Sequence, residues 1–168
     1  MSKKLFLIFS LFLISILSFS QATITRTATA YVNINSYMSL DISTNGFLDF
    51  RFNNNQELLD GITLPNKFNV SINSNKNWLL NVSTLTSKFL AIGSQASTQM
   101  PPDILSIKKN NSSTFVPLSQ NSNTVGIGYK GDNTSAGNQF KLDIKATPGY
   151  TFNGGTYAIV LIFTLSPQ

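Results

Sequence analysis

Few residues of this chain are of the types that carry out acid, base or nucleophilic chemistry. Its 168 residues include no histidine and no cysteine, which supply most general bases and the most reactive nucleophiles. Two pairs of carboxylates lie close in sequence, Asp41 with Asp49 and Glu57 with Asp60. Such a pair can hydrolyse a glycoside only at a defined separation, which sequence does not set. The sequence therefore predicts a protein that is not an enzyme, with a carboxylate-dependent glycan hydrolase as an alternative.

One segment begins like a calcium-binding loop. Asp41, Ser43 and Asn45 stand at the first, third and fifth positions of that pattern, and Gly46 stands at the sixth. The pattern requires an acidic residue at its twelfth position, where this chain has Phe52. We therefore expect a strand that ends in an Asn-Gly turn, and we predict no catalytic residue, no metal site and no cofactor.

Aromatic side chains offer a second route to a ligand, because they can stack on sugar rings. The single tryptophan, Trp78, is either such a surface platform or a residue of the core, and the neighbouring Leu79 and Leu80 favour burial. The better candidates for exposed aromatic residues are Tyr31, Tyr37 and Tyr129. A soluble glycan-binding module therefore remains an alternative function.

Residues 1–20 have the form of a secretory signal peptide. Two lysines open the segment, an apolar run covers residues 5–17, and small residues permit cleavage after Ser20 or after Ala22. The apolar run is shorter than the ~20 residues that a membrane-spanning helix needs. We expect a protein that is secreted to the cell surface or periplasm, with no membrane span in the mature chain.

The chain from residue 21 to residue 168 has the length of one ordinary domain. Without Lys3 and Lys4 the formal net charge of +5 falls to +3, and no basic cluster is longer than Lys108-Lys109. This charge is too dispersed to indicate a nucleic-acid partner. The absence of cysteine means that packing and strand pairing, not disulfides, must hold an exported fold together.

The elements that would position all these side chains are strands. Residues 140–146, "FKLDIKA", alternate apolar and charged side chains, and residues 67–72 alternate in the same way. Turn-forming residues such as Asn45-Gly46 separate the alternating runs. We predict an all-β fold with little or no helix after the signal peptide, a single antiparallel β-sandwich of the immunoglobulin-like or pilin-like kind.

Residues 157–165 are apolar on both faces, which predicts a strand inside the sandwich with a neighbour on each side. The expected core residues are Phe68, Val70, Ile72, Trp78, Leu80, Val82, Phe140, Leu142, Ile144, Ile159, Leu161 and Phe163.

Residues 21–35 alternate as well and predict a first strand. Its apolar face carries Ile24, Ala28, Ala30, Val32 and Ile34, and Arg26 interrupts that face. Burial of an unpaired arginine is costly, so the pattern favours a strand docked within its own sandwich. The alternative is a segment that completes the sheet of a neighbouring subunit, which gives a homo-oligomer or another surface assembly by strand addition.

Two family resemblances cover most of the chain after Leu40. Trp78-Leu79-Leu80 and the closing Phe163-Thr164-Leu165 with Pro167 resemble the Trp-x-Leu motifs of WxL domains in bacterial cell-surface proteins, although Phe163 replaces the second tryptophan. That resemblance implies non-covalent attachment to cell-wall glycan.

The segments Leu48-Asp49-Phe50 and Gly155-Thr156-Tyr157 resemble those of spore-coat-protein-U-like and fimbrial subunits of Gram-negative bacteria, which usually carry a disulfide that is absent here. Both resemblances imply a secreted, non-catalytic β-sandwich that forms a structural or adhesive component of the bacterial envelope.

Overall fold

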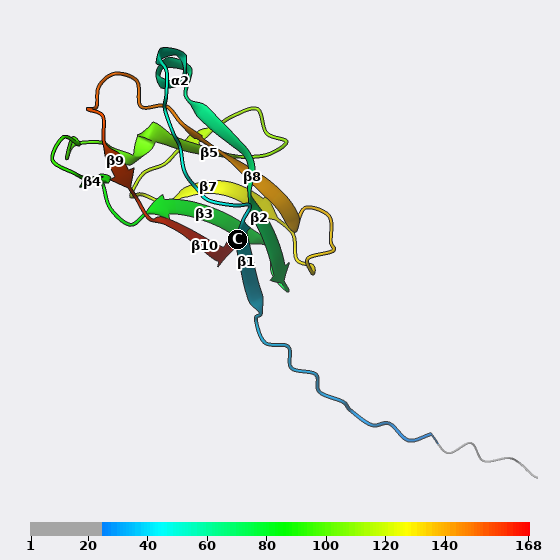
Figure 1. Cartoon of the computed structure of the whole chain (residues 1–168). Helices are drawn as coiled ribbons and strands as arrows, with labels where there is room; N and C mark the ends of the chain where they lie inside the picture. The colour runs from blue at the N-terminus through cyan, green and yellow to red at the C-terminus, as the bar shows by residue number, and fades with distance from the viewer. Residues whose placement is uncertain (1–24) are drawn as a thin grey trace, which may run out of the picture. The chain divides into compact units, whose positions relative to one another are not determined.

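The computed structural model describes residues 25–168, and its regular structure consists almost entirely of strands (Figure 1). The strands are β1 (Met38–Thr44), β2 (Ile62–Ser74), β3 (Trp78–Thr84), β4 (Leu90–Ile92), β5 (Leu105–Lys109), β6 (Val116–Pro117), β7 (Asn123–Gly128), β8 (Gln139–Ala146), β9 (Thr156–Ala158) and β10 (Leu161–Pro167). The helical elements are the short helix α2 (Asn55–Asp60) and the 3-10 turn η1 (Pro102–Ile104). The prediction of an all-β chain is confirmed.

Two antiparallel sheets form the sandwich. The larger sheet has the strand order β1-β2-β8-β5-β6, and the smaller has the order β10-β3-β7. Strands β4 and β9 pair separately as a two-stranded ribbon. The edge strands that matter most for the candidate site are β1 in the larger sheet and β10 in the smaller one.

A bulge interrupts the pairing of β2 with β8 between Leu64 and Phe68. Pro65 lies in the bulge, where its missing N–H costs no ladder hydrogen bond. Asn66 has φ of 50°, and its N–H donates a 2.8 Å hydrogen bond to a carboxylate oxygen of Asp143. The bulge thereby bends β2 without leaving its backbone unsatisfied.

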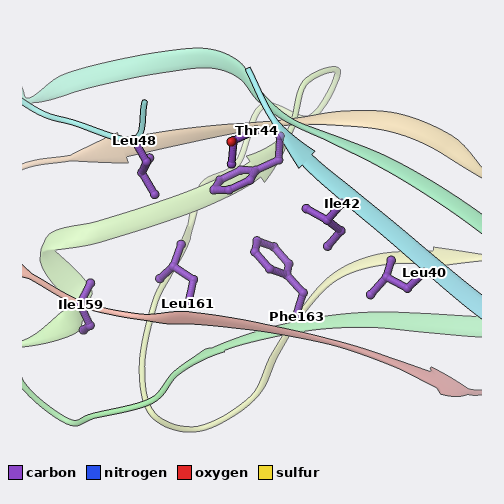
Figure 2. Close-up of a pocket in the computed structure, with 8 residues that line it drawn as sticks. Leu40, Ile42, Thr44, Leu48, Ile159, Leu161 and Phe163 are labelled. Atoms are coloured by element: carbon purple, nitrogen blue, oxygen red, sulfur yellow. The ribbon is translucent and has the colours of Figure 1, made fainter. Parts of the chain in front are cut away.

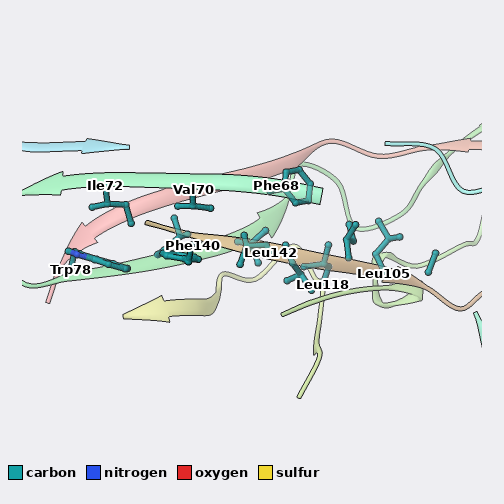
Figure 3. Close-up of a cluster of buried hydrophobic side chains, with 13 residues drawn as sticks. Phe68, Val70, Ile72, Trp78, Leu105, Leu118, Phe140 and Leu142 are labelled. Carbon is teal, nitrogen blue, oxygen red and sulfur yellow. The ribbon is translucent and has the colours of Figure 1, made fainter. Parts of the chain in front are cut away.

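The core lies between the two sheets and joins side chains from both (Figure 3). Nine of the expected core residues are buried: Phe68, Val70, Ile72, Trp78, Leu80, Val82, Phe140, Leu142 and Ile144. The core also includes Leu105 and Ile107 of β5, together with Leu118, none of which was expected.

The prediction for the closing strand is wrong. Strand β10 lies at the edge of its sheet, where it pairs with β3 on one side only. Ile159, Leu161 and Phe163 are half-buried, and Val160 and Ile162 on the opposite face are exposed. An apolar sequence does not by itself place a strand in the interior, because the number of neighbours depends on which strands the rest of the chain provides.

The chain divides into two units, Met1–Ile34 and Asn35–Gln168, and the sandwich belongs to the second. Residues 25–34 form neither helix nor strand, and the side chains of Tyr31, Val32 and Ile34 are 88%, 81% and 80% exposed. The predicted docked strand over residues 21–35 is therefore wrong for the described residues. The first strand is β1, whose residues pair with β2 from Met38 opposite Ser74 to Thr44 opposite Phe68. The expected signal peptide and Ile24 lie outside the described residues.

Candidate functional site: an apolar groove between two sheet edges

An apolar groove of about 470 Å³ opens between β1 and β10 (Figure 2). The lining residues are Leu40, Ile42, Thr44, Leu48, Phe68, Ile159, Leu161 and Phe163. All but the threonine are hydrophobic, and no titratable side chain is among them. The groove can therefore bury apolar side chains, but it has no group for acid, base or nucleophilic chemistry.

Both rims of the groove carry unpaired backbone. Within the part of the chain that the structure describes, β1 pairs only with β2, and β10 pairs only with β3. Each strand therefore has one edge whose N–H and C=O groups are free to pair with another chain segment. A groove with an apolar floor and two free strand edges is suited to an extended segment that inserts alternate side chains and hydrogen-bonds through its backbone.

The two rims run in opposite directions, as the arrows of β1 and β10 in Figure 2 show. Strand β1 is antiparallel to β2, and residues 75–77 reverse the chain between β2 and β3. Strand β10 is antiparallel to β3 and is therefore antiparallel to β1 as well. A segment that lies between them must be parallel to one rim and antiparallel to the other.

Two contacts hold the shape of the groove. The ring of Phe163 meets the ring of Phe68 edge-on, with their centroids 5.2 Å apart. At the end of β1, the ammonium group of the buried Lys67 donates hydrogen bonds to the carbonyl oxygens of Asn45 (2.7 Å) and Phe47. These bonds anchor the loop that carries Leu48 into the groove.

The predicted interaction residues separate into two groups. Arg26, Ala28, Ala30, Tyr31 and Val32 all lie in the exposed segment 25–34. The structure contradicts a contact role for Trp78, whose side chain has no exposed surface. Sequence reasoning had left Trp78 open as a surface platform, but its ring stacks on Phe140 in the core.

Asp49 and Glu57, one carboxylate from each predicted pair, make local contacts. Asp49 forms an ion pair with Arg51 at 2.7 Å, which raises the pKa of the arginine, mainly through the hydrogen bond between the two side chains. Glu57 accepts a 2.6 Å hydrogen bond from the N–H of Asn53, and the side chain of Asn54 in turn caps helix α2 by accepting from the N–H of Glu57. Among residues 25–168 there is no cluster of three potential metal ligands.

The segments that carry the family resemblances occupy defined places in the fold. Trp78 and Leu80 of β3 lie opposite Pro167 and Leu165 of β10, so the two Trp-x-Leu-like segments pair with each other. The hydroxyl of Tyr157 donates to the carbonyl oxygen of Asn153 at 2.6 Å and accepts from the N–H of Ser97 at 2.9 Å. These residues hold the approach to β10, which forms one rim of the groove.

Comparison with known proteins adds no family: the chain matches no protein-family model and no curated protein. No helix in residues 25–168 is long and apolar enough to cross a membrane.

Sequence reasoning missed the half of the groove that β1 contributes. Leu40, Ile42 and Leu48 were not singled out, although Met38, Leu40 and Ile42 alternate with polar residues in "MSLDIS". That short alternation could have indicated a strand. It could not have indicated that β1 faces β10, because the two strands lie about 120 residues apart in the sequence.

Proposed function

We propose that this protein is a secreted, non-catalytic component of the bacterial cell surface whose copies join by strand addition. Residues 28–34 of one copy fill the groove between β1 and β10 of another. The observation that supports the proposal is that one chain has both an apolar groove with two free strand edges and an exposed segment with the matching alternation.

The segment and the groove match in length and in chemistry. Residues 28–34 and β10 each contain seven residues, and a strand of this length spans about 20 Å. In a strand, Ala28, Ala30, Val32 and Ile34 would share one face and enter the groove. Arg26 lies two residues beyond this stretch and keeps its charge in water, so the cost of burying it does not arise.

The groove-facing side chains of β10 also support an added strand. Leu161 and Phe163 line the groove and stay half-buried in the single chain. A donated segment would pair with the free edge of β10 and cover Leu161 and Phe163. The edge strand of the single chain would then become a central strand of the assembly.

The expected leader and the resemblance to fimbrial subunits support a place in the envelope, and the lack of catalytic groups in the groove supports a structural role. The WxL-like and glycan-binding alternatives cannot use Trp78, which is enclosed in the core, and glycan binding would depend on the exposed Tyr31, Tyr37 and Tyr129 instead. Strand addition therefore explains more of the structure than glycan binding does.

The test uses the full chain, expressed with its own leader and purified, beside the variants Val32→Asp and Asn33→Asp. These substitutions introduce the same charge at adjacent positions that point to opposite faces of a strand. Sedimentation should show concentration-dependent oligomers for the unchanged chain and for N33D, and monomers for V32D. The V32D chain retains an intact groove and should bind a labelled peptide of residues 23–35. A wild-type chain that stays monomeric, together with a V32D chain that ignores the peptide, would refute strand addition.

A further inference from the structure

We infer that Asn75 acts as a positioning residue that stops the chain from filling its own groove, so that the groove stays open for a second copy. This inference rests on the proposed function, and it concerns which copy supplies the strand. Asn75 belongs to the turn between β2 and β3, next to the point where residues 35–37 lead into β1.

Assembly between copies requires such a block because each segment is tethered close to the groove of its own chain. A segment joined to the groove by a short flexible link has an effective concentration of roughly millimolar. At ordinary protein concentrations it would occupy its own groove before a second molecule arrived. Assembly between copies therefore requires a geometry that forbids the internal reaction.

The sequence would otherwise permit the internal reaction in good register. A three-residue turn at residues 35–37 would place Ile34 opposite Met38, Val32 opposite Leu40 and Ala30 opposite Ile42. Three-residue loops are among the common connections of β-hairpins. Residues directly opposite in an antiparallel pair share a face, so the apolar side chains of the segment would then enter the groove.

Asn75 holds those three turn residues in another arrangement. Its Oδ1 accepts a 2.9 Å hydrogen bond from the N–H of Tyr37, and its own N–H donates to the carbonyl oxygen of Tyr37 at 3.1 Å. Its Nδ2 donates to the carbonyl oxygen of Asn35 at 2.7 Å. These three bonds tie both ends of residues 35–37 to the β2–β3 turn, and a hairpin turn at these residues would have to break them.

A two-residue turn placed earlier in the chain does not bring the apolar face of residues 28–34 to the chain's own groove. If Asn33 and Ile34 formed a two-residue turn, Val32 would lie opposite Asn35. Thr27 would then lie opposite Leu40 and Thr25 opposite Ile42, so that threonines would replace the apolar side chains. With residues 35–37 held by Asn75, such a turn brings threonines, and not Ala30, Val32 and Ile34, to the chain's own groove.

The test compares full chains carrying Asn75→Ala and Asn121→Ala. Asn121 is an exposed asparagine in another loop, and only its backbone carbonyl accepts a hydrogen bond. Sedimentation measures assembly, and amide hydrogen exchange measures protection of residues 28–34 in the monomer fraction. We expect N75A to form monomers with protected amides, and its half-assembly concentration to rise at least about tenfold. N121A should behave as wild type.

A second variant covers the case in which N75A does not fold. Three glycines inserted between Ile34 and Asn35 leave the Asn75 hydrogen bonds intact but give the chain a longer link with which residues 28–34 can reach their own groove. This variant should also become monomeric with a protected segment. Wild-type assembly and unprotected monomers in every variant that folds would overturn the role of Asn75 and leave strand addition standing. A wild-type chain that never assembles, with a V32D chain that ignores the peptide, would overturn both.

Discussion

The indole Nε1 of Trp78 donates a 3.0 Å hydrogen bond to Oδ1 of Asn138 in the interior of the sandwich, where both side chains are buried. The Nδ2 of Asn138 donates in turn to the carbonyl oxygen of Asp132, also at 3.0 Å. The indole ring lies nearly parallel to Phe140, at 9° and with 6.1 Å between the centroids. The side-chain amide of Asn138 therefore links the turn before β8 to Trp78 in the core.

Replacement of Asn138 by alanine should destabilise the fold. The change leaves the buried N–H of Trp78 without an acceptor, so we expect a loss of about 1–3 kcal/mol in the free energy of unfolding. Urea denaturation followed by far-ultraviolet circular dichroism measures this loss in each background, with N121A as the exposed asparagine control. In a W78F background the same substitution should cost clearly less. Equal costs in both backgrounds would show that the hydrogen bond contributes nothing.

Gly128 should not tolerate a side chain. A Cβ atom at this position would lie 2.1 Å from Cζ2 of Trp78, so G128A forces the strand or the ring to move. We expect a loss of about 1–3 kcal/mol from overpacking. Gly154 provides the matched control, because a Cβ there meets nothing within 4 Å, and G154A should stay within about 0.5 kcal/mol of wild type. Thermal or urea unfolding of the two variants tests this prediction, and equal stabilities of G128A and G154A would contradict it.

Asp132 should make stability depend on pH in acid solution. Hydrogen bonds from the side chain of Thr134, then from that of Ser135, lower the pKa of Asp132 below its ordinary value of 3.8. A carboxylate with a depressed pKa stabilises the fold above its unfolded value, and this contribution is lost as pH falls from 3.8 through the folded value. D132N cannot titrate at this position, so its unfolding free energy should change less steeply below pH 4. Unchanged acid profiles would count against this role.

Leu142 and Leu161 should respond differently to the same charge. Leu142 is fully buried in the core, and L142D should lose more than about 4 kcal/mol and fail to fold. Leu161 is half-buried and faces the groove, so L161D should fold with a loss of about 1–2 kcal/mol. A chain that carries both L161D and V32D should no longer bind the peptide of residues 23–35. An L161D chain that bound this peptide normally would exclude the groove as its site.

Local pattern was enough to predict much of the fold. The alternation in residues 140–146 predicted the strand that the structure shows as β8. The apolar neighbours of Trp78 favoured its burial, which the structure confirms. These features are readable because the period of side chains along a strand is a property of the backbone and does not depend on distant residues.

Patterns of the same kind gave wrong predictions for two other segments. Alternation over residues 21–35 predicted a docked strand, and two-sided apolarity predicted an interior place for residues 157–165. Residues 25–34 form no strand, and β10 is an edge strand. A strand exists only beside a partner, and alternation indicates what a segment can pair with but not whether a partner is present.

The amino-acid sequence alone determined the all-β class, nine buried core positions and the scarcity of catalytic groups, because composition and periodicity act locally along the chain. Only the tertiary structure decided that Leu40 and Ile42 of β1 face Leu161 and Phe163 of β10 across an open groove. Those residues come from opposite ends of the sandwich's sequence. They meet because β1 pairs with β2 and β10 pairs with β3, and the choice of partner depends on long-range packing that no local pattern encodes.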